Sequence, residues 1–203
     1  MSQKANNIYS LLSNTFVYSF VQMIMSSTAF QKKIVKKYIT KERVNVLDIG
    51  CGPAEILDSL PNVYYYGYDV NHTYINYAKK KYGSRGKFYC KKFTKSEIKK
   101  LPKFDHVLLL NILHHLGDEE IKNLMQLLKK VLKKGGNIIS QDPILIKKQN
   151  LLAKFIINKD RGNNVRSKSG YIKIITKYFK KINSKIYHQK FIPYTYFVML
   201  FKS

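Results

Sequence analysis

The stretch that decides the fold is Val46-Leu47-Asp48-Ile49-Gly50-Cys51-Gly52-Pro53. Apolar and β-branched residues surround one acid at its start, which is typical of a buried parallel strand. Two glycines follow, and glycine lets the backbone turn sharply and approach a ligand closely. A helix is expected directly after the turn, where its free N–H groups attract a carboxylate or phosphate. The stretch therefore predicts a ligand-binding turn between a strand and a helix.

Asp69 closes the next predicted strand, in Tyr65-Tyr66-Gly67-Tyr68-Asp69-Val70-Asn71. A carboxylate at this position can accept hydrogen bonds from both hydroxyls of a ribose. The glycine turn and this acid together predict a nucleoside-binding site. A dinucleotide fits poorly, because its fingerprint has a third glycine three residues after the second, and this chain has Glu55 there.

The composition indicates one globular domain, since the chain has 203 residues and 45% of them are hydrophobic. The net charge of +25 arises from 37 basic and only 12 acidic residues. Such a charge can indicate an anionic partner, such as RNA, a lipid headgroup or an acidic metabolite. Few of the basic residues are arginine, which recognises phosphates and bases best. We therefore favour solvated, lysine-rich helix faces as the explanation.

The two cysteines, Cys51 and Cys90, stand at unrelated positions. They give neither a disulfide framework nor a zinc pattern, so no metal is expected and a reducing cytoplasm fits best. Residues 11–25 are apolar, and their apolar side chains fall on one helical stripe. Polar residues interrupt this segment, and it lacks the length of a spanning helix and the features of a signal peptide. We expect a helix docked on the domain, with weak contact to a membrane surface as the alternative.

Strand-like and helix-like runs alternate from residue 45 onward, which predicts βαβ units and a parallel sheet. Strands are expected at residues 45–49, 63–68, 87–91, 105–110 and 137–141. Helices are expected at residues 54–59, 73–82, 118–132, 151–157 and 168–179. Two final strand-like runs, 185–191 and 194–201, predict a terminal β-hairpin.

Several motifs resemble those of the class I S-adenosylmethionine (SAM)-dependent methyltransferases. Asp48-Ile49-Gly50-Cys51-Gly52 is similar to their motif I, and Asp69 is similar to their ribose-binding acid. Residues 104–116, which end in the pair His114 and His115, resemble the fourth-strand motif, and residues 128–136 resemble the turn into strand five. The C-terminal part of the chain looks like a subgroup of small bacterial methyltransferases, many of which have no assigned substrate.

The resemblance implies a Rossmann-like α/β fold with a seven-stranded, mostly parallel sheet and an antiparallel C-terminal strand. It implies one methyltransferase domain over residues 1–203. Within this domain, residues 1–43 would form an N-terminal helical lid and residues 44–142 the SAM-binding core. Residues 143–203 would form a substrate-side insertion and the terminal β-hairpin.

SAM is the cofactor that the resemblance implies. Its methionine end would lie against Gly50, Cys51 and Gly52, with the methionine carboxylate at the helix N-terminus. Asp48 would orient this loop, or else cap the following helix. Strand three is often followed by an acid near adenine, but here Lys92 and Phe93 follow, so backbone groups and ring stacking would replace the carboxylate. The cofactor-binding residues are expected to be Asp48, Gly50, Cys51, Gly52, Asp69, Val70, Lys92, Phe93 and Asn111.

His114 and His115 follow strand four, where the acceptor should meet the methyl group. Either histidine could remove a proton from a hydroxyl or acid. Both could equally be structural, because methyl transfer from a sulfonium needs in-line alignment and exclusion of water more than it needs a base. A substrate lid that recognises an anionic group is expected from Arg161, Arg166, Tyr171, Tyr194 and His188.

The acceptor class can be narrowed by motifs that the chain lacks. Amino-directed nucleic-acid methyltransferases carry an Asn/Asp-Pro-Pro-aromatic motif after strand four, whereas this chain has Asn111-Ile112-Leu113-His114. Cytosine C5 enzymes need a Pro-Cys nucleophile, and neither cysteine has that setting. We therefore expect methyl transfer to a small-molecule, glycan or lipid-linked acceptor. The alternative is an RNA-binding or RNA-modifying methyltransferase-like protein that uses the basic surface, and the sequence does not indicate the oligomeric state.

Overall fold

The computed structural model describes residues 27–147, 149, 154, 157, 164–188 and 194–202. The expected apolar helix at residues 11–25 lies outside these residues. The pattern at residues 151–157 is described only at residues 154 and 157, which are both helical.

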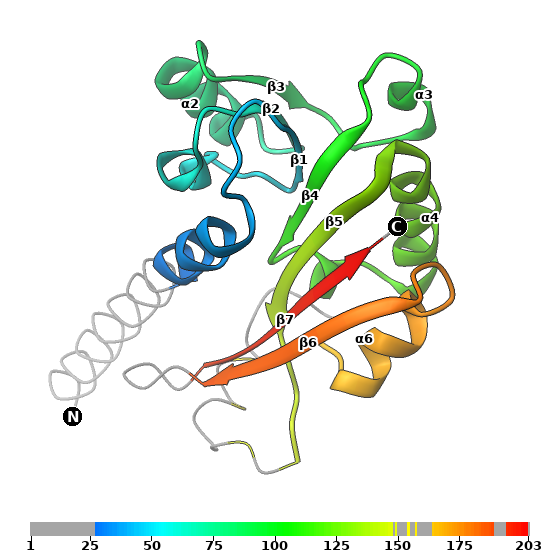
Figure 1. Cartoon of the computed structure of the whole chain (residues 1–203). Coiled ribbons are helices and arrows are strands. Elements are labelled where there is room, and N and C mark those ends of the chain that lie inside the picture. Colours follow the sequence, from blue (N-terminus) through cyan, green and yellow to red (C-terminus); the bar gives the residue numbers. More distant parts are fainter. Residues whose placement is uncertain are drawn as a thin grey trace, which may run out of the picture.

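In the described part of the chain, seven strands form one sheet in the order β3-β2-β1-β4-β5-β7-β6 (Figure 1). Neighbouring strands from β3 to β5 are parallel, and β7 runs antiparallel to both β5 and β6. The expected sheet and its antiparallel C-terminal strand are thus confirmed. The strands are β1 (Asn45–Ile49), β2 (Tyr64–Asp69), β3 (Gly86–Cys90), β4 (Phe104–Leu110), β5 (Leu132–Pro143), β6 (Lys181–His188) and β7 (Thr195–Lys202).

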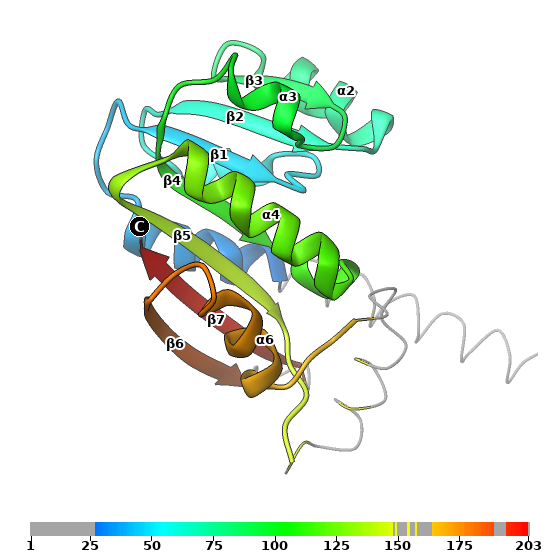
Figure 2. The same cartoon turned by 90° about the vertical axis from the view of Figure 1, so that its right-hand side faces the viewer.

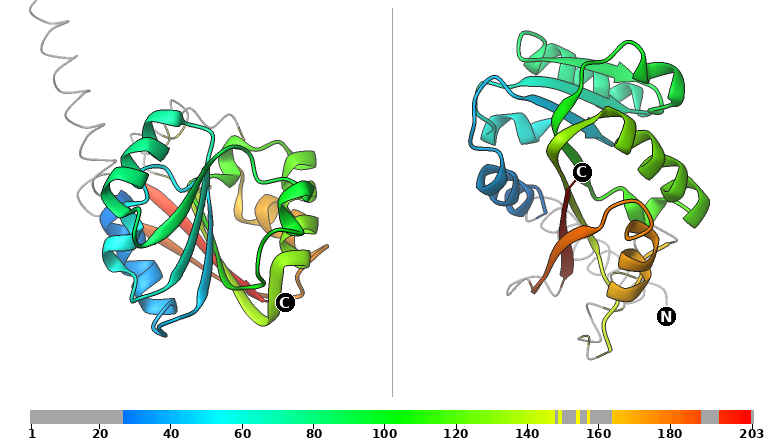
Figure 3. Two further views of the ribbon diagram at one scale, coloured as in Figure 1. Left: turned by 90° about the horizontal axis from the view of Figure 1, so that it is seen from above. Right: turned by 45° about the vertical axis from the view of Figure 1, so that its right-hand side comes forward.

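Helices cover both faces of the sheet (Figures 2 and 3). One face packs against the helix at residues 27–38, the 3₁₀ helix η1 (Glu55–Ser59) and α2 (His72–Tyr82). The other face packs against α3 (Lys95–Ile98), the 3₁₀ helix η2 (Leu113–His115), α4 (Asp118–Val131) and α6 (Lys168–Ile175). Side chains alternate between the two faces along each strand. In β1, Val46 packs with the first group of helices and Leu47 with the second.

The amphipathic pattern of α4 shows why these helices dock. Ile121, Leu124, Met125 and Leu128 are buried at the spacing of one helix face. Three acids occupy the first turn and two lysines the last, which suits the helix dipole. The side chain of α4 residue Glu120 also accepts a 3.0 Å hydrogen bond from the backbone N–H of Gly117, so the helix begins where the sequence predicts.

Three expected boundaries are wrong. Strand β6 begins at Lys181 instead of residue 185. Strand β5 begins at Leu132, before the glycines that were expected to form a turn, because Leu132 is buried and pairs with Phe104. The two glycines lie within β5, where the pairing register with β4 shifts, and Gly135 has a φ of +78°. Helix α6 ends at Ile175 instead of residue 179, and Phe179 packs into the core against Phe201 at a ring-centroid distance of 5.2 Å.

Candidate active site

The glycine loop lies at the carboxyl end of β1, in the middle of the sheet. Gly50 and Gly52 have φ values of +74° and +52°, a region that favours glycine. The backbone N–H groups of Gly50 and Cys51 both donate to the Tyr68 carbonyl, at 2.7 and 3.1 Å. A Cβ atom on Gly50 would lie 2.7 Å from the Cδ1 atom of Ile112. A side chain at position 50 would push the end of the Ile112 side chain aside, and the positive φ would strain the backbone of any other residue there.

Asp69 lies at the end of β2 and contacts this loop directly. Its Oδ2 atom accepts a hydrogen bond from the Gly52 N–H at 2.9 Å, and its Oδ1 atom accepts one from the Asn71 N–H at 2.8 Å. The side chain of Asn71 then caps α2 by accepting from Thr73 and Tyr74. Each carboxylate oxygen keeps a second acceptor position, so the group can still bind ribose hydroxyls. Val70 follows with 65% of its surface exposed, at the rim of the site.

Asp48 is buried beneath the loop. The Tyr65 hydroxyl donates to its Oδ2 atom at 2.6 Å, whereas its Oδ1 atom has no hydrogen-bond partner among the described residues. Burial raises the pKa of this carboxyl from 3.8 to about 7; the Tyr65 hydrogen bond lowers it and the charge of Asp69 raises it further. The alternative that Asp48 caps the next helix is wrong, because Ala54 occupies the cap position of η1 without a side-chain hydrogen bond.

A small cavity of about 70 Å³ lies between this loop and the helix at residues 27–38. The acidic residues Asp48 and Glu55 both line it, and η1, which follows the loop, is only five residues long. The expected carboxylate site at a helix N-terminus is therefore not supported, because two acids beside a short helix suit a cation better than an anion. The lining residues are Thr28, Gln31, Asp48, Gly50, Cys51, Pro53, Glu55, Ile56 and Leu110.

Cys51 serves this loop as a small buried residue. Burial, together with the charges of Asp48 and Asp69, raises the pKa of its thiol well above the ordinary range. A thiol that stays protonated is a poor nucleophile. The residue therefore contributes its backbone, and not thiol chemistry, to the site.

Asn111 ties the carboxyl end of β4 to the N-terminal helix. Its backbone has φ +57°, and its N–H donates to the Gln141 carbonyl at 2.7 Å. Its side-chain amide donates to the Ser27 hydroxyl at 2.9 Å. The Oε1 atom of fully buried Gln141 has no partner among the described residues. Two buried acceptor atoms at this edge of the sheet, Oδ1 of Asp48 on β1 and Oε1 of Gln141 on β5, thus have no hydrogen-bond partner among the described residues.

The adjacent histidines have different environments. His114 is 2% exposed, and its Nδ1 atom lies 2.8 Å from Oδ1 of Asp142, which also accepts from the His114 backbone N–H at 3.1 Å. Burial raises the pKa of the Asp142 carboxyl, while the contacts with His114 lower it. His115 is exposed, and its ring centroid lies 4.0 Å from that of His114. The buried His114–Asp142 pair therefore holds the turn that presents His115.

The expected adenine end differs from the prediction in one respect. Phe93 is only 8% exposed and packs edge-on against Tyr68 at 5.3 Å, so little of its ring is available for stacking on adenine. Lys92 is well exposed, with its Nζ atom 3.8 Å from Glu120. An acid that sequence reasoning missed, Glu97 on α3, binds the Lys91 ammonium group at 2.7 Å and accepts from the Tyr68 hydroxyl at 3.3 Å.

The expected substrate lid is not assembled from the residues that the structure describes. Arg166 donates all its guanidinium N–H groups to protein acceptors: the carbonyls of Leu113, Leu116 and Asn164, and the Asp118 carboxylate. Tyr171 is buried and donates to the Pro143 carbonyl at 3.2 Å. Tyr194 is buried beside the ring of Tyr196. These residues have structural roles, His188 is exposed at the end of β6, and Arg161 lies outside the described residues.

Two features are absent from the described residues. No group of three or more His, Cys, Asp or Glu side chains gathers there closely enough to hold a metal ion. Within the same residues, every helix is too short or too polar to cross a membrane.

Comparisons with known proteins concern the family and the fold of the chain. The family model described as "Methyltransferase domain" matches residues 46–136. The N-methyltransferase NodS from Bradyrhizobium japonicum WM9 superposes with a TM-score of 0.66 at 14% identity, covering 86% of this chain and 94% of that one. A Pyrococcus horikoshii OT3 protein gives 0.65 at 20% identity, covering 89% and 91%. Human N-acetylserotonin methyltransferase, solved with SAM, gives 0.61 at 20% identity, covering 78% and 47%.

A search of curated protein sequences finds no match to this chain. The family match nevertheless spans the glycine loop, Asp69 and the histidine pair. NodS has also been solved with S-adenosylhomocysteine bound, at 14% identity and a TM-score of 0.61. The sheet order and the antiparallel β7 agree with the class I methyltransferase fold of these structures. The chain therefore carries a class I SAM-dependent methyltransferase domain.

Proposed function

We propose that this protein transfers the methyl group of SAM to a small acceptor, which is a free small molecule, a glycan or a lipid-linked compound. The observation that carries the proposal is the contact between the glycine loop and Asp69 at the carboxyl edge of the sheet. This contact brings a backbone that a ligand can approach closely beside an acid suited to a ribose. Bound SAM would supply a methyl group on a positively charged sulfonium.

The residues around the loop fit the two ends of SAM. Asp69 would accept hydrogen bonds from the ribose hydroxyls, and the backbone from Gly50 to Gly52 would follow the methionine portion. The unused Oδ1 atom of Asp48 and the nearby Glu55 carboxylate favour the methionine ammonium group in the small cavity. Asn111 would contact the cofactor from β4.

Few side chains are available to contact the adenine of SAM. Val70 and Lys92 would line the rim of its site, since both are exposed next to β2 and β3. Phe93 would contribute its backbone, because its ring is committed to the core. No carboxylate follows β3 directly, so we expect backbone groups to recognise the adenine amino group.

On the acceptor side, His115 is the proposed catalytic residue. It is exposed after β4, and His114 is the positioning residue that fixes it through Asp142. A neutral His115 imidazole would take the proton that an acceptor hydroxyl or amine releases as it is methylated. The helix at residues 27–38 contributes Thr28 and Gln31 to the cofactor cavity, which supports a lid function for the N-terminal segment 1–43.

The rest of the chain would divide into a SAM-binding core and an acceptor side. Residues 44–142 would form the SAM-binding core, and they include β1 to β5 except for the last residue of β5. Residues 143–203 would form the acceptor side and complete the sheet with β6 and β7.

The distribution of charge favours a small acceptor over RNA. An RNA-binding surface would gather lysines on one face, together with aromatic side chains. Here lysines end α2 on one side of the sheet and α4 on the other side. The basic residues are spread over the molecule, as solvated helix faces would be.

Transfer of labelled methyl groups tests this proposal. The protein is incubated with methyl-labelled SAM and with separate fractions of small metabolites, glycans, lipid extract and total RNA. We expect label in one of the first three fractions, and none with the Asp69→Ala variant. Glu42→Ala serves as the control, because Glu42 is exposed and precedes β1, at the opposite end of that strand from the glycine loop. Label found only in RNA would overturn the choice of acceptor class.

A further inference from the structure

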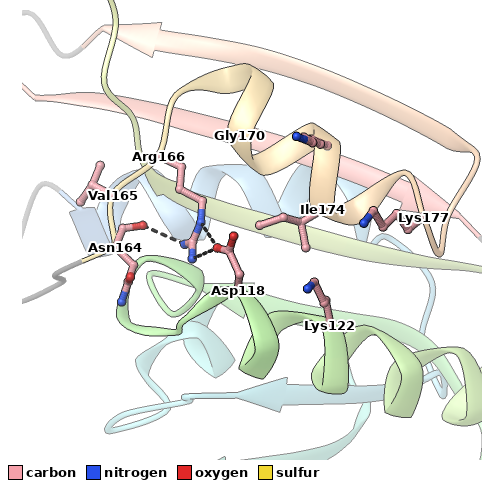
Figure 4. A pocket seen from close by; sticks show the side chains of 9 residues that line it. Asp118, Lys122, Asn164, Val165, Arg166, Gly170, Ile174 and Lys177 are labelled. Atoms are coloured by element: carbon pink, nitrogen blue, oxygen red, sulfur yellow. Dashed lines mark hydrogen bonds and ion pairs between the residues drawn. The ribbon is translucent and has the colours of Figure 1, made fainter.

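A second, larger cavity lies apart from the glycine loop. It is a groove of about 590 Å³ between α4 and α6, on the opposite face of the sheet from the helix at residues 27–38 (Figure 4). Such a volume is in the range of sites for small ligands, roughly 300–1,000 Å³. The groove is lined by Asp118, Lys122, Asn164, Val165, Arg166, Gly170, Lys173, Ile174 and Lys177.

The spacing of residues on the two helices builds this groove. Lys173 and Lys177, which are four residues apart, follow one side of α6 and the turn after it. Lys122 stands on the facing side of α4, and Figure 4 shows Lys122 and Lys177 on opposite walls of the groove. Gly170 lets α6 approach the preceding segment, because a Cβ atom there would lie 3.2 Å from the Arg166 Cβ atom.

The groove carries an excess of positive charge. The only carboxylate among its lining residues, that of Asp118, is neutralised by Arg166 through hydrogen bonds of 3.0 and 2.6 Å. Lys122 pairs with Glu119, a side chain that is 78% exposed and can turn toward water. Among the described residues, neither Lys173 nor Lys177 has an acidic partner. Lys173 and Lys177 therefore give the groove a positive charge that no acidic side chain of the described residues balances.

Folding alone does not explain this arrangement. Lysines that line one groove repel one another, because like charges in a shared cavity raise its electrostatic energy. A bound anion would remove the repulsion. None of the nine lining residues is aromatic, so the groove lacks the stacking surfaces that a single-stranded nucleic acid uses.

We propose that this groove binds a small ligand that carries two or more linked phosphoryl groups. Lys122 would bind one end from α4, and Lys173 and Lys177 would bind the other from α6, while Ile174 and Val165 supply an apolar floor. The structure places this site next to the acceptor side of the enzyme, since the Asn164 N–H donates to the His114 carbonyl at 3.0 Å. The proposal does not depend on the acceptor of the methyl transfer.

Calorimetry on the full chain tests the groove with pyrophosphate and tripolyphosphate as probes. The groove variant combines Lys173→Gln with Lys177→Gln. Its matched control combines Lys79→Gln with Lys80→Gln, two exposed lysines of α2 that change the net charge equally on the other face. We expect about tenfold weaker binding in the groove variant and less than about twofold change in the control, since two exposed ion contacts are lost. The affinity for SAM should be the same in all three proteins.

Three results would overturn the proposal. The wild-type protein could fail to bind either probe, or both variants could weaken binding equally, which would show unspecific attraction to a basic protein. If neither probe binds but the wild type binds single-stranded RNA and the groove variant does not, the first result would assign the groove to a nucleic-acid surface. Loss of SAM binding in the groove variant would show that the two sites are not separate.

Discussion

Replacing Asp48 with asparagine should make the protein more stable at alkaline pH and weaken its binding of SAM. Asp48 is wholly buried, with one oxygen bonded to the Tyr65 hydroxyl and the other without a partner among the described residues. Asparagine has the same shape and keeps an acceptor for Tyr65, but it carries no charge. The variant thus removes the buried charge and changes little else.

The magnitude follows from the pKa of Asp48, which is about 7 in the folded protein against 3.8 ordinarily. Between these values the folded protein holds a proton that the unfolded chain has released, so raising the pH from about 4 to 7 favours unfolding. A shift of about three pKa units corresponds to about 4 kcal/mol in the free energy of unfolding. The wild type loses this amount in full once Asp48 is ionised above pH 7. The variant avoids this loss, but the unpaired N–H groups of its asparagine amide cost about 1–3 kcal/mol. Its free energy of unfolding at pH 8 should therefore exceed that of the wild type by about 1–3 kcal/mol.

Urea unfolding of the wild type and Asp48→Asn at pH 8 and pH 4.5 measures this difference. The advantage of the variant should be present at pH 8 and should shrink toward pH 4.5, where Asp48 is protonated in the folded protein. Glu119→Gln, at an exposed position, should show no such pH dependence. Calorimetry should find SAM binding weakened at least about tenfold, because the ammonium group loses a charged partner. A variant that is less stable than the wild type at pH 8 would refute the reasoning.

Three other substitutions separate structural from catalytic roles. His114→Ala should lower the free energy of unfolding by about 3–5 kcal/mol, because it leaves the Asp142 carboxylate buried without its partner, as urea unfolding will show. His115→Ala should keep the melting temperature and lower turnover by about 10²–10⁴-fold if it is the base; unchanged turnover would exclude that role. Gly50→Ala should abolish SAM binding measured by calorimetry, since its Cβ atom would lie 2.7 Å from the Ile112 side chain. Arg166→Lys should lower the melting temperature by several degrees, because a lysine cannot reproduce the guanidinium contacts, and a melting curve like the wild type would contradict this.

The sequence was most informative where structure is set locally. The apolar runs and turn residues predict the strands of the sheet, and the glycines and Asp69 predict a site that the fold does bring together. Parallel strands that are consecutive in sequence share one carboxyl edge, so residues at their ends meet without any knowledge of long-range contacts.

Residues that depend on long-range packing were not predicted. Thr28 and Gln31 line the small cavity beside the glycine loop, and they come from a helix that carries no motif. Asp142 ends a buried strand, and only the fold shows that it faces His114. An acid at the end of a buried strand was the one available signal for it.

The expected substrate lid was wrong for a different reason. Arg166 and Tyr171 are residue types that often bind anions or substrates, and the sequence cannot show whether their donors are already used. In the fold, Arg166 joins the histidine turn to the start of α6, and Tyr171 packs in the core.

The central claim is that the glycine loop and Asp69 form a SAM site, and titration of SAM into the wild type and Asp69→Ala tests it most directly. The wild type should bind one SAM per chain. Asp69→Ala should bind at least about 100-fold more weakly, because two hydrogen bonds to a charged acceptor are lost. Its melting temperature without ligand should fall by several degrees, because the Gly52 and Asn71 N–H groups lose their acceptor, but the variant should still unfold cooperatively. Equal affinity in the two proteins, or no binding by the wild type, would contradict the account.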